Sequence, residues 1–161
     1  NDTYETANLE YHIQRLRCDK LGDPLHSFPA ITVSVCNLRP KSRGHVRLSS
    51  SDPYASPIIT PNYLSHPEDK QVAADALKLS RRICQAAAFN KYAPEEFKPG
   101  IEINTDDELI KAAGDIATTI FHPVGTCKMG NDAMSVVDDE LKVHGIDQLR
   151  VVDASIMPKI E

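Results

Sequence analysis

The chain lacks any excess of basic residues and any long apolar run. Its 161 residues contain 18 Lys and Arg against 23 Asp and Glu, which gives a formal net charge of −5 at pH 7. A nucleic-acid-binding domain normally gathers Lys and Arg on one face, so the acidic balance argues against a nucleic-acid partner. No stretch reaches the roughly 18 apolar residues of a membrane-spanning helix, which predicts a soluble chain.

The cysteines lack the spacing of a structural framework. Cys18, Cys36, Cys84 and Cys127 lie far apart, and no Cys-x-x-Cys motif occurs. This pattern indicates neither a zinc site nor a set of disulfides. Reduced thiols are the ordinary state in the cytosol, so we expect a cytoplasmic protein.

Neither a starting methionine nor a basic-then-apolar leader is present. The chain begins at Asn1 and stops at Glu161, directly after an apolar segment. A secretory signal peptide would show the leader, and the total length fits one ordinary domain. We therefore expect one domain that belongs to a longer protein.

Alternating patterns in the first third of the chain predict β-strands. β-branched and apolar residues alternate over residues 31–36, and again over residues 45–49 beyond a Pro/Gly loop. This spacing is typical of half-buried strands, and the loop favours an antiparallel pair between these two segments. A weaker alternation from Leu9 to Leu16 predicts an edge strand, while prolines restrict residues 51–61 to turns or a short edge strand.

Two capping signals predict two helices. The first has Ser65 as its cap, a proline in its first turn and one apolar face over about residues 68–89. The second begins after Thr105 with a capping box and acidic residues, and Pro123 should end it near His122. Strands followed by helices indicate an α+β fold, a small antiparallel sheet with packed helices.

The end of the chain consists of short apolar pieces and turns. Residues 149–155 read as a strand that ends in the carboxylate of Asp153. In open α/β sheets, carboxylates at the carboxyl ends of strands often hold ligand hydroxyls. The competing interpretation is that Asp153 only caps the turn at Ala154 and Ser155, and the pattern alone favours this second interpretation.

The segment with the most chemical content runs from His122 to Gly130. Histidine is the common general acid or base at neutral pH, and here a proline and a glycine-containing loop follow it. A structural histidine at a helix C-terminus explains the pattern equally well. Nucleophilic hydrolysis by Cys127 with His122 or His144 has suitable residue types but no visible oxyanion hole. The same three residues match no standard metal-ligand spacing, so no metal site is predicted.

Longer segments carry a resemblance to a known family. The string FHPVGTCKMG, followed by VVDDELKVHGIDQLRVVDASIMP, is similar to the C-terminal region of the glucose-methanol-choline (GMC) flavin oxidoreductases, in the branch of choline and alcohol dehydrogenases. SVCNLRPKSRGHVRLSSSDPYASPIITPNYL resembles the substrate-domain strands of that family, and HPEDKQVAADALKLSRRI resembles the helix after them. The resemblance runs in order from about Leu9 to Ile160, which is far more specific than a lone glycine motif.

The resemblance implies part of an FAD-dependent enzyme that oxidises the CH–OH group of a small-molecule alcohol. His122 matches the histidine that accepts the substrate hydroxyl proton as hydride passes to flavin N5. Asp153 and Ala154 match residues that touch the ribityl and pyrophosphate region of FAD, and residues 126–128 would position His122. Residues 1–161 would form the C-terminal substrate-binding domain, with the tail from about residue 136 returning to an FAD-binding domain outside this chain.

Two departures from the family pattern matter. The chain has no GxGxxG nucleotide motif, and the second catalytic His or Asn of the family would lie beyond Glu161. We therefore expect no turnover and little or no FAD retention by the chain alone. Its apolar tail should be poorly ordered or covered by self-association. A standalone, non-catalytic α+β binding module is the alternative, and the motifs specify neither the alcohol nor the electron acceptor.

Overall fold

The computed structural model describes residues 6–15 and 23–160, which form two compact units. Unit 1 falls within residues 1–42 and 64–118, and unit 2 within residues 43–63 and 119–161. The chain therefore passes from one unit to the other after Ser42, Tyr63 and Thr118. Small antiparallel sheets and a few helices confirm the predicted α+β class. None of the helices in the described ranges is long and apolar enough to cross a membrane.

Unit 1 contains a two-stranded antiparallel sheet. Strand β1 (Leu9–Gln14) pairs with β2 (Thr32–Asn37), with Tyr11 opposite Val35. Both strands lie where the sequence alternates, so both strand predictions are confirmed, although Leu16 lies outside the described residues. The predicted pairing of residues 31–36 with residues 45–49 is wrong, because β1 is the antiparallel neighbour of β2.

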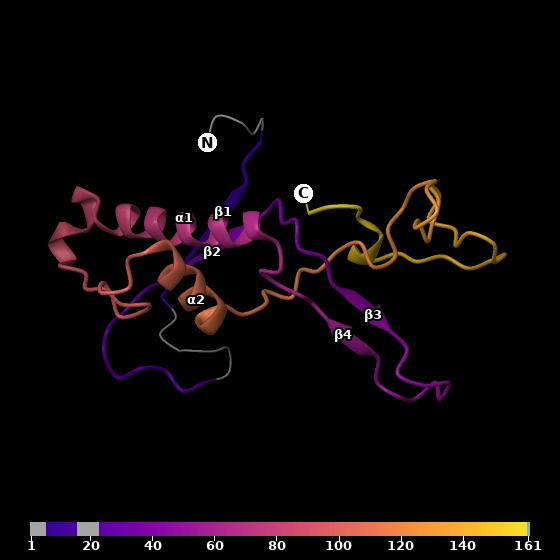
Figure 1. The fold of residues 1–161 in the computed structure, drawn as a ribbon, viewed down its shortest axis with the longest axis horizontal. Helices are drawn as coiled ribbons and strands as arrows, with labels where there is room; N and C mark the ends of the chain where they lie inside the picture. The colour runs from indigo at the N-terminus through magenta and orange to yellow at the C-terminus, as the bar shows by residue number, and fades with distance from the viewer. Residues whose placement is uncertain (1–5, 16–22, 161) are drawn as a thin grey trace. The chain divides into compact units, whose positions relative to one another are not determined.

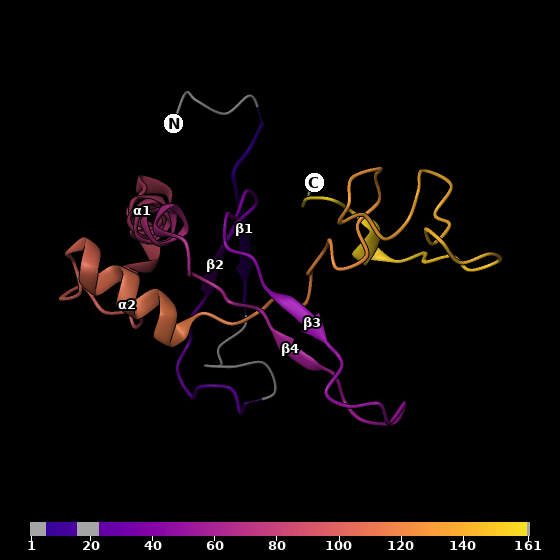
Figure 2. The ribbon, with the colours of Figure 1, turned by 45° about the vertical axis from the view of Figure 1, so that its right-hand side comes forward.

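Two helices lie side by side in unit 1 (Figures 1 and 2). Helix α1 (Pro67–Cys84) packs on α2 (Asp106–Ile116). Ala76 of α1 and Ala113 of α2 are both buried. Leu109 of α2 is fully buried. The Tyr11 hydroxyl donates to the carbonyl oxygen of Ala76 over 3.2 Å and so connects the sheet to α1.

The capping signals locate the helix starts better than the helix ends. The capping box at Thr105 is present in both halves, as predicted, whereas α1 has His66 as its cap in place of the predicted Ser65. Helix α1 also ends earlier than predicted, at Cys84, because Ala86 is extended and a separate 3₁₀ helix, η1 (Ala87–Tyr92), follows.

Helix α2 ends well before the predicted limit at His122. It stops at Ile116, and Ala117 is already extended with φ −69° and ψ 152°. The β-branched residues that follow, Thr118, Thr119 and Ile120, are weaker helix formers than the residues inside α2, so the proline at position 123 is not what ends the helix.

Unit 2 contains the second antiparallel pair. Strand β3 (His45–Arg47) pairs with β4 (Ile58–Thr60) in a hairpin, with Val46 opposite Ile59. The β4 segment confirms the predicted short strand in the proline-rich region. Gly44 permits the close approach beside the hairpin, because a Cβ there would lie 2.2 Å from the carbonyl oxygen of Thr60.

The rest of unit 2 is held by isolated bridges rather than strands. Val137 is fully buried and forms bridges with Met129 and Val143. The predicted strand over residues 149–155 is wrong, because its described residues form only one isolated bridge, at Arg150, and then turn into a 3₁₀ helix. Within the described residues, this segment has no neighbouring strand that could extend the bridge into a ladder.

Candidate active site

His122 lies in an irregular segment of unit 2, beyond the end of α2 at Ile116. Its side chain is exposed. The interpretation of His122 as a cap at a helix C-terminus is therefore wrong. An exposed imidazole in an irregular segment can meet a ligand or another part of a longer protein.

The turn that precedes His122 is fixed by two hydroxyl groups. The backbone N–H of Phe121 donates to Thr119 Oγ1 over 3.1 Å, and the Tyr63 hydroxyl donates to the same oxygen over 2.9 Å. Phe121 has φ 61°, a left-handed conformation that a bulky residue rarely adopts. Sequence reasoning did not single out Tyr63 or Thr119, which lie 56 residues apart.

The loop after His122 is bound to the end of the chain by backbone hydrogen bonds. The N–H groups of Cys127 and Met129 donate to the carbonyl oxygens of Ser155 and Ile156 over 3.0 and 2.8 Å. Gly125 begins this loop with φ 87°, a conformation that favours glycine. The structure thus brings together the two segments that the sequence singled out, the loop behind His122 and the segment around Asp153.

Asp153 caps the 3₁₀ helix η2 (Ala154–Ile156). Its Oδ1 accepts from the N–H of Ser155 over 2.8 Å, as the capping interpretation predicts. Hydrogen bonds from Ser155 hold the pKa of Asp153 below its usual value, so the carboxylate is charged at neutral pH. Asp153 and Ala154 are both exposed. A carboxylate offers about four acceptor sites, so one that caps a turn can also accept from an external donor.

The loop over residues 128–135 is closed by a second carboxylate. Asp132 accepts hydrogen bonds from Lys128 Nζ, the N–H of Met134 and the hydroxyl of Ser135, over 2.6, 2.9 and 3.0 Å. These donors, with Lys128 first, lower the pKa of Asp132 to about 2. This network fixes the segment between the His122 loop and buried Val137.

The alternatives of hydrolysis and metal binding involve Cys127, His122 and His144, and the structure bears on His144. One ring nitrogen of His144, Nε2, lies 2.9 Å from the carbonyl oxygen of Gly130, which can only accept, so this nitrogen donates there. It is therefore not available as a base for Cys127. Among residues 6–15 and 23–160, no group of three or more His, Cys, Asp or Glu side chains could hold a metal ion.

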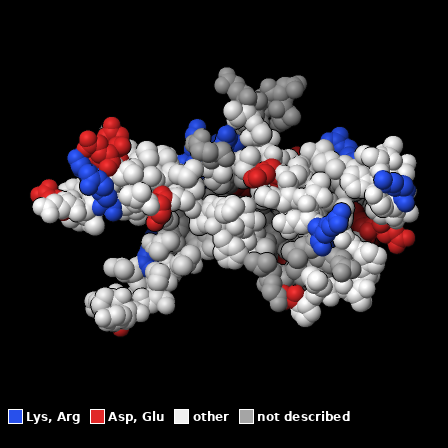
Figure 3. Space-filling view, turned by 180° about the vertical axis from the view of Figure 1, so that it is seen from behind, with Lys and Arg blue, Asp and Glu red and all other residues white. Residues whose placement is uncertain are grey.

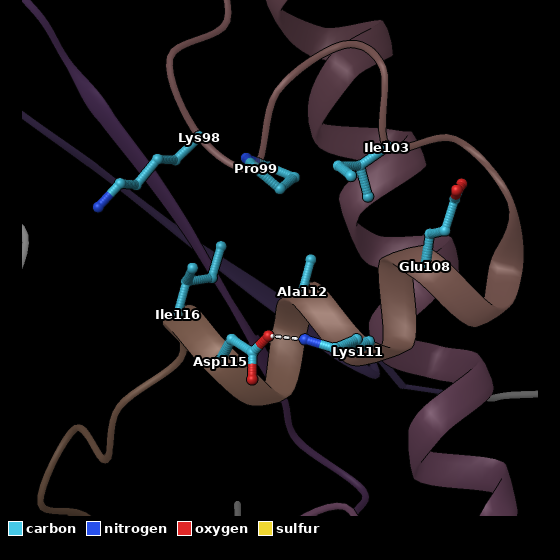
Figure 4. A pocket seen from close by; sticks show the side chains of 8 residues that line it. All are labelled: Lys98, Pro99, Ile103, Glu108, Lys111, Ala112, Asp115 and Ile116. Carbon is cyan, nitrogen blue, oxygen red and sulfur yellow. Dashed lines mark hydrogen bonds and ion pairs between the residues drawn. The ribbon is translucent and has the colours of Figure 1, made fainter.

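Two cavities lie away from these residues. One of about 300 Å³ lies in unit 1 between α2 and the loop before it. Apolar Pro99, Ile103 and Ile116 line it, together with charged Lys98 and Glu108 (Figure 4). A second, of about 520 Å³, is formed by Asp138 and residues 142–148 of unit 2. Neither is lined by His122 or Asp153. On the face shown in Figure 3, acidic and basic side chains form small separate groups among larger uncharged areas.

Comparison with known proteins decides which family these elements belong to. A model of the family described as GMC oxidoreductase matches residues 40–161, well over half of the chain. The chain belongs to the GMC oxidoreductase family. The match contains His122, Asp153 and Ala154, together with the Tyr63 and Thr119 pair.

Two named relatives match this GMC chain over almost its whole length. The oxygen-dependent choline dehydrogenase of Klebsiella pneumoniae subsp. pneumoniae is 46% identical over 153 residues, which are 95% of this chain and 28% of that protein. The enzyme of the same name from Escherichia coli strain K12 is 44% identical over 159 residues, 99% of this chain and 29% of that protein. The chain thus spans less than a third of the length of these relatives.

Solved structures show the same fold. Pyridoxine 4-oxidase from Mesorbium loti superposes with a TM-score of 0.75 at 34% identity, over 86% of this chain and 27% of that one. A fungal aryl-alcohol oxidase superposes with a TM-score of 0.73 at 32% identity, over 81% of this chain and 22% of that one. The GMC chain therefore has the fold of one part of these oxidases.

Proposed function

We propose that the chain is the C-terminal substrate-binding part of a longer FAD-dependent enzyme that oxidises an alcohol. The observation that carries this proposal is the 46% identity to an oxygen-dependent choline dehydrogenase over 95% of the chain but only 28% of that relative. The tail from about residue 136 would pack against an FAD-binding domain that this chain does not contain. The two oxidase structures, named for pyridoxine and aryl alcohols, support alcohol oxidation as the common reaction.

The described residues fit one side of a flavin cofactor. Asp153 offers an exposed, ionised carboxylate that can accept a hydrogen bond from a ribityl hydroxyl, and the small side chain of Ala154 leaves room for a close approach. No GxGxxG motif is present in the sequence to cradle the ADP part. When bound, FAD supplies a hydride acceptor for the carbon that bears the alcohol oxygen.

His122 would act as the general base of this reaction. A ring nitrogen of its exposed imidazole would accept the proton of the substrate hydroxyl. Loss of that proton gives the oxygen alkoxide character, which makes loss of hydride from the adjoining carbon easier, and a positioned base typically contributes a factor of about 10² to 10⁴. Pro123 restricts the backbone of His122 and so limits the directions in which the ring can point.

Choline is the first substrate to test, because both relatives that cover almost the whole chain are named choline dehydrogenases. The experiment compares the 161-residue chain with the longer protein that contains it. Flavin absorbance and alcohol-dependent reduction of a dye are measured for both, with oxygen as a parallel acceptor and with choline, aromatic and aliphatic alcohols as substrates.

The longer protein should be yellow and should oxidise at least one alcohol class, whereas the chain alone should be colourless and inactive. A longer protein that binds no flavin, or that oxidises none of the alcohols, would contradict the proposed reaction. An active, flavin-containing 161-residue chain would contradict the proposal that the FAD-binding part lies outside it. A chain that folds but is never found in a longer protein would favour the standalone binding module.

A further inference from the structure

The turn before His122 depends on one side-chain oxygen. Thr119 Oγ1 accepts the N–H of Phe121, two residues later, over 3.1 Å. This arrangement is the local turn that Ser and Thr side chains form with their own backbone. It holds the residue directly before His122 and leaves the imidazole itself exposed.

The backbone at Phe121 needs such support. Its φ of 61° places a bulky aromatic residue in the left-handed region, which is energetically unfavourable and persists only where neighbouring contacts determine it. Residues with such a strained backbone conformation cluster at functional sites. Because Pro123 restricts His122 from the other side, the direction of the imidazole depends on the turn over residues 119–121.

Tyr63 fixes the position of the Thr119 side chain. Its hydroxyl donates to Thr119 Oγ1 over 2.9 Å from a segment that is 56 residues away in sequence. Tyr63 lies between two further left-handed residues, Asn62 with φ 55° and Leu64 with φ 54°. The Asn62 side chain donates to the carbonyl oxygen of Arg43 over 3.0 Å, which fastens this segment in turn.

We infer that Thr119, held by Tyr63, is a positioning residue for His122 in proton transfer from the alcohol. This inference rests on the proposed function. Without Oγ1 the N–H of Phe121 loses its acceptor, so the left-handed turn can relax and the backbone of His122 rotates. A displacement of about 1 Å at a reacting group can lower the rate up to about a hundredfold, while substrate binding changes much less.

The test uses the longer protein, with Thr119→Val, Tyr63→Phe and the rescue variant Thr119→Ser. Valine matches threonine in shape and has a methyl group in place of the hydroxyl, and Tyr63→Phe removes a single oxygen. Tyr54→Phe is the matched control, because Tyr54 lies in the same unit and is 95% exposed. Steady-state kinetics give kcat and KM separately, and hydrogen exchange followed by mass spectrometry monitors the peptide that contains Phe121.

Thr119→Val should lower kcat between about tenfold and a hundredfold with little change in KM, and should speed exchange at Phe121. Tyr63→Phe should give a smaller loss of the same kind, while Thr119→Ser and Tyr54→Phe should resemble the unchanged protein. An unaltered kcat in Thr119→Val, or a loss that Thr119→Ser does not restore, would overturn the inference. If Thr119→Val fails to fold, an unaltered kcat in Tyr63→Phe would overturn it instead.

Failure of the proposed function gives a different result. In that case the unchanged longer protein oxidises no alcohol. Unchanged exchange at Phe121 in both Thr119→Val and Tyr63→Phe would then overturn the inference without reference to activity.

Discussion

Asp69 is a buried charged side chain, 4% exposed, in the first turn of α1. Its carboxylate accepts from the N–H groups of Lys41 and Ser42, at 2.9 and 2.6 Å, and from the amide of Asn37 at 3.3 Å. Burial alone would raise its pKa, but the hydrogen bonds from Ser42 and Lys41 outweigh burial and lower the pKa. The ionised carboxylate therefore fastens the segment after β2 to α1.

Asp69→Ala should destabilise the chain by about 2–4 kcal/mol, because the partly buried N–H groups of Lys41 and Ser42 lose the acceptor that holds their segment against α1. Urea denaturation measures the free energy of unfolding. Asp107→Ala is the matched control, since Asp107 is an exposed carboxylate in the first turn of α2, and its loss should cost less than about 1 kcal/mol. Equal losses in the two variants would contradict this role of Asp69.

The same carboxylate should make stability fall in acid. The pKa of Asp69 in the folded chain lies below the unfolded value of about 3.9, so its contribution is fully present above that value. This contribution to stability is lost as the pH falls through the pKa that Asp69 has in the folded chain. Urea midpoints measured from neutral pH downward should decline less steeply in Asp69→Asn than in the unchanged chain, and identical slopes would count against the assignment.

Single residues differ in how well the sequence reveals them. The resemblance singles out His122 and Asp153, and the capping interpretation of Asp153 agrees with its bond to Ser155. Tyr63 and Thr119 could not be found in this way, because their relation is a tertiary contact between distant segments. A threonine two residues before an aromatic residue, as Thr119 is before Phe121, forms no recognisable sequence motif.

At the scale of elements, a bidentate ion pair connects the last turn of α1 to the segment that precedes α2. Arg81 Nε and Nη2 each donate to a carboxylate oxygen of Glu96 over 2.8 Å, and Nη2 also donates to the carbonyl oxygen of Gly100. The two side chains are 15% and 20% exposed, so the pair is largely shielded from water. The hydrogen bonds that Arg81 donates to the Glu96 carboxylate raise the pKa of Arg81 above its usual value.

Arg81→Leu should lower the free energy of unfolding by about 2–4 kcal/mol, because it leaves the charge of Glu96 without its partner. Replacing both residues by leucine should recover most of that loss, since no shielded charge then remains. Glu95→Gln is the control, because Glu95 is the exposed neighbour of Glu96. Thermal unfolding monitors all four proteins, and a double variant no more stable than Arg81→Leu would disprove the account.

Elements follow from the sequence where the interactions that form them are local. The capping box at Thr105 involves residues three apart, and it forms as predicted. The partner of β2 depends on which strand of the folded chain lies beside it, and there the prediction was wrong. The strand predicted at residues 149–155 fails for the same reason, because apolar alternation cannot supply a neighbour.

At the scale of the whole molecule, unit 2 exposes many apolar side chains. Met134 and Val152 are 77% and 72% exposed. Val152 lies in the tail that we propose packs against an FAD-binding domain, and Met134 lies just before that tail. Apolar surface of this kind normally marks an interaction site. This tail belongs to unit 2, which also contains residues 43–63.

The isolated chain should therefore self-associate. Sedimentation velocity over a range of concentrations should show a weight that rises with concentration, and Met134→Ser with Val152→Ser should reduce that rise. Leu25→Ser is the control, because Leu25 is an exposed apolar residue of unit 1. A monomer at every concentration would refute the prediction, as would equal effects of the control and the paired substitution.

The role of His122 is the central claim, and kcat for alcohol oxidation by the longer protein tests it most directly. His122→Ala should lower kcat by a factor of about 10² to 10⁴, the usual contribution of a positioned general base. His45→Ala, which removes an exposed histidine from β3 of the same unit, should leave kcat unchanged. A His122→Ala protein that retains flavin and oxidises the alcohol at the rate of the unchanged enzyme would contradict the account.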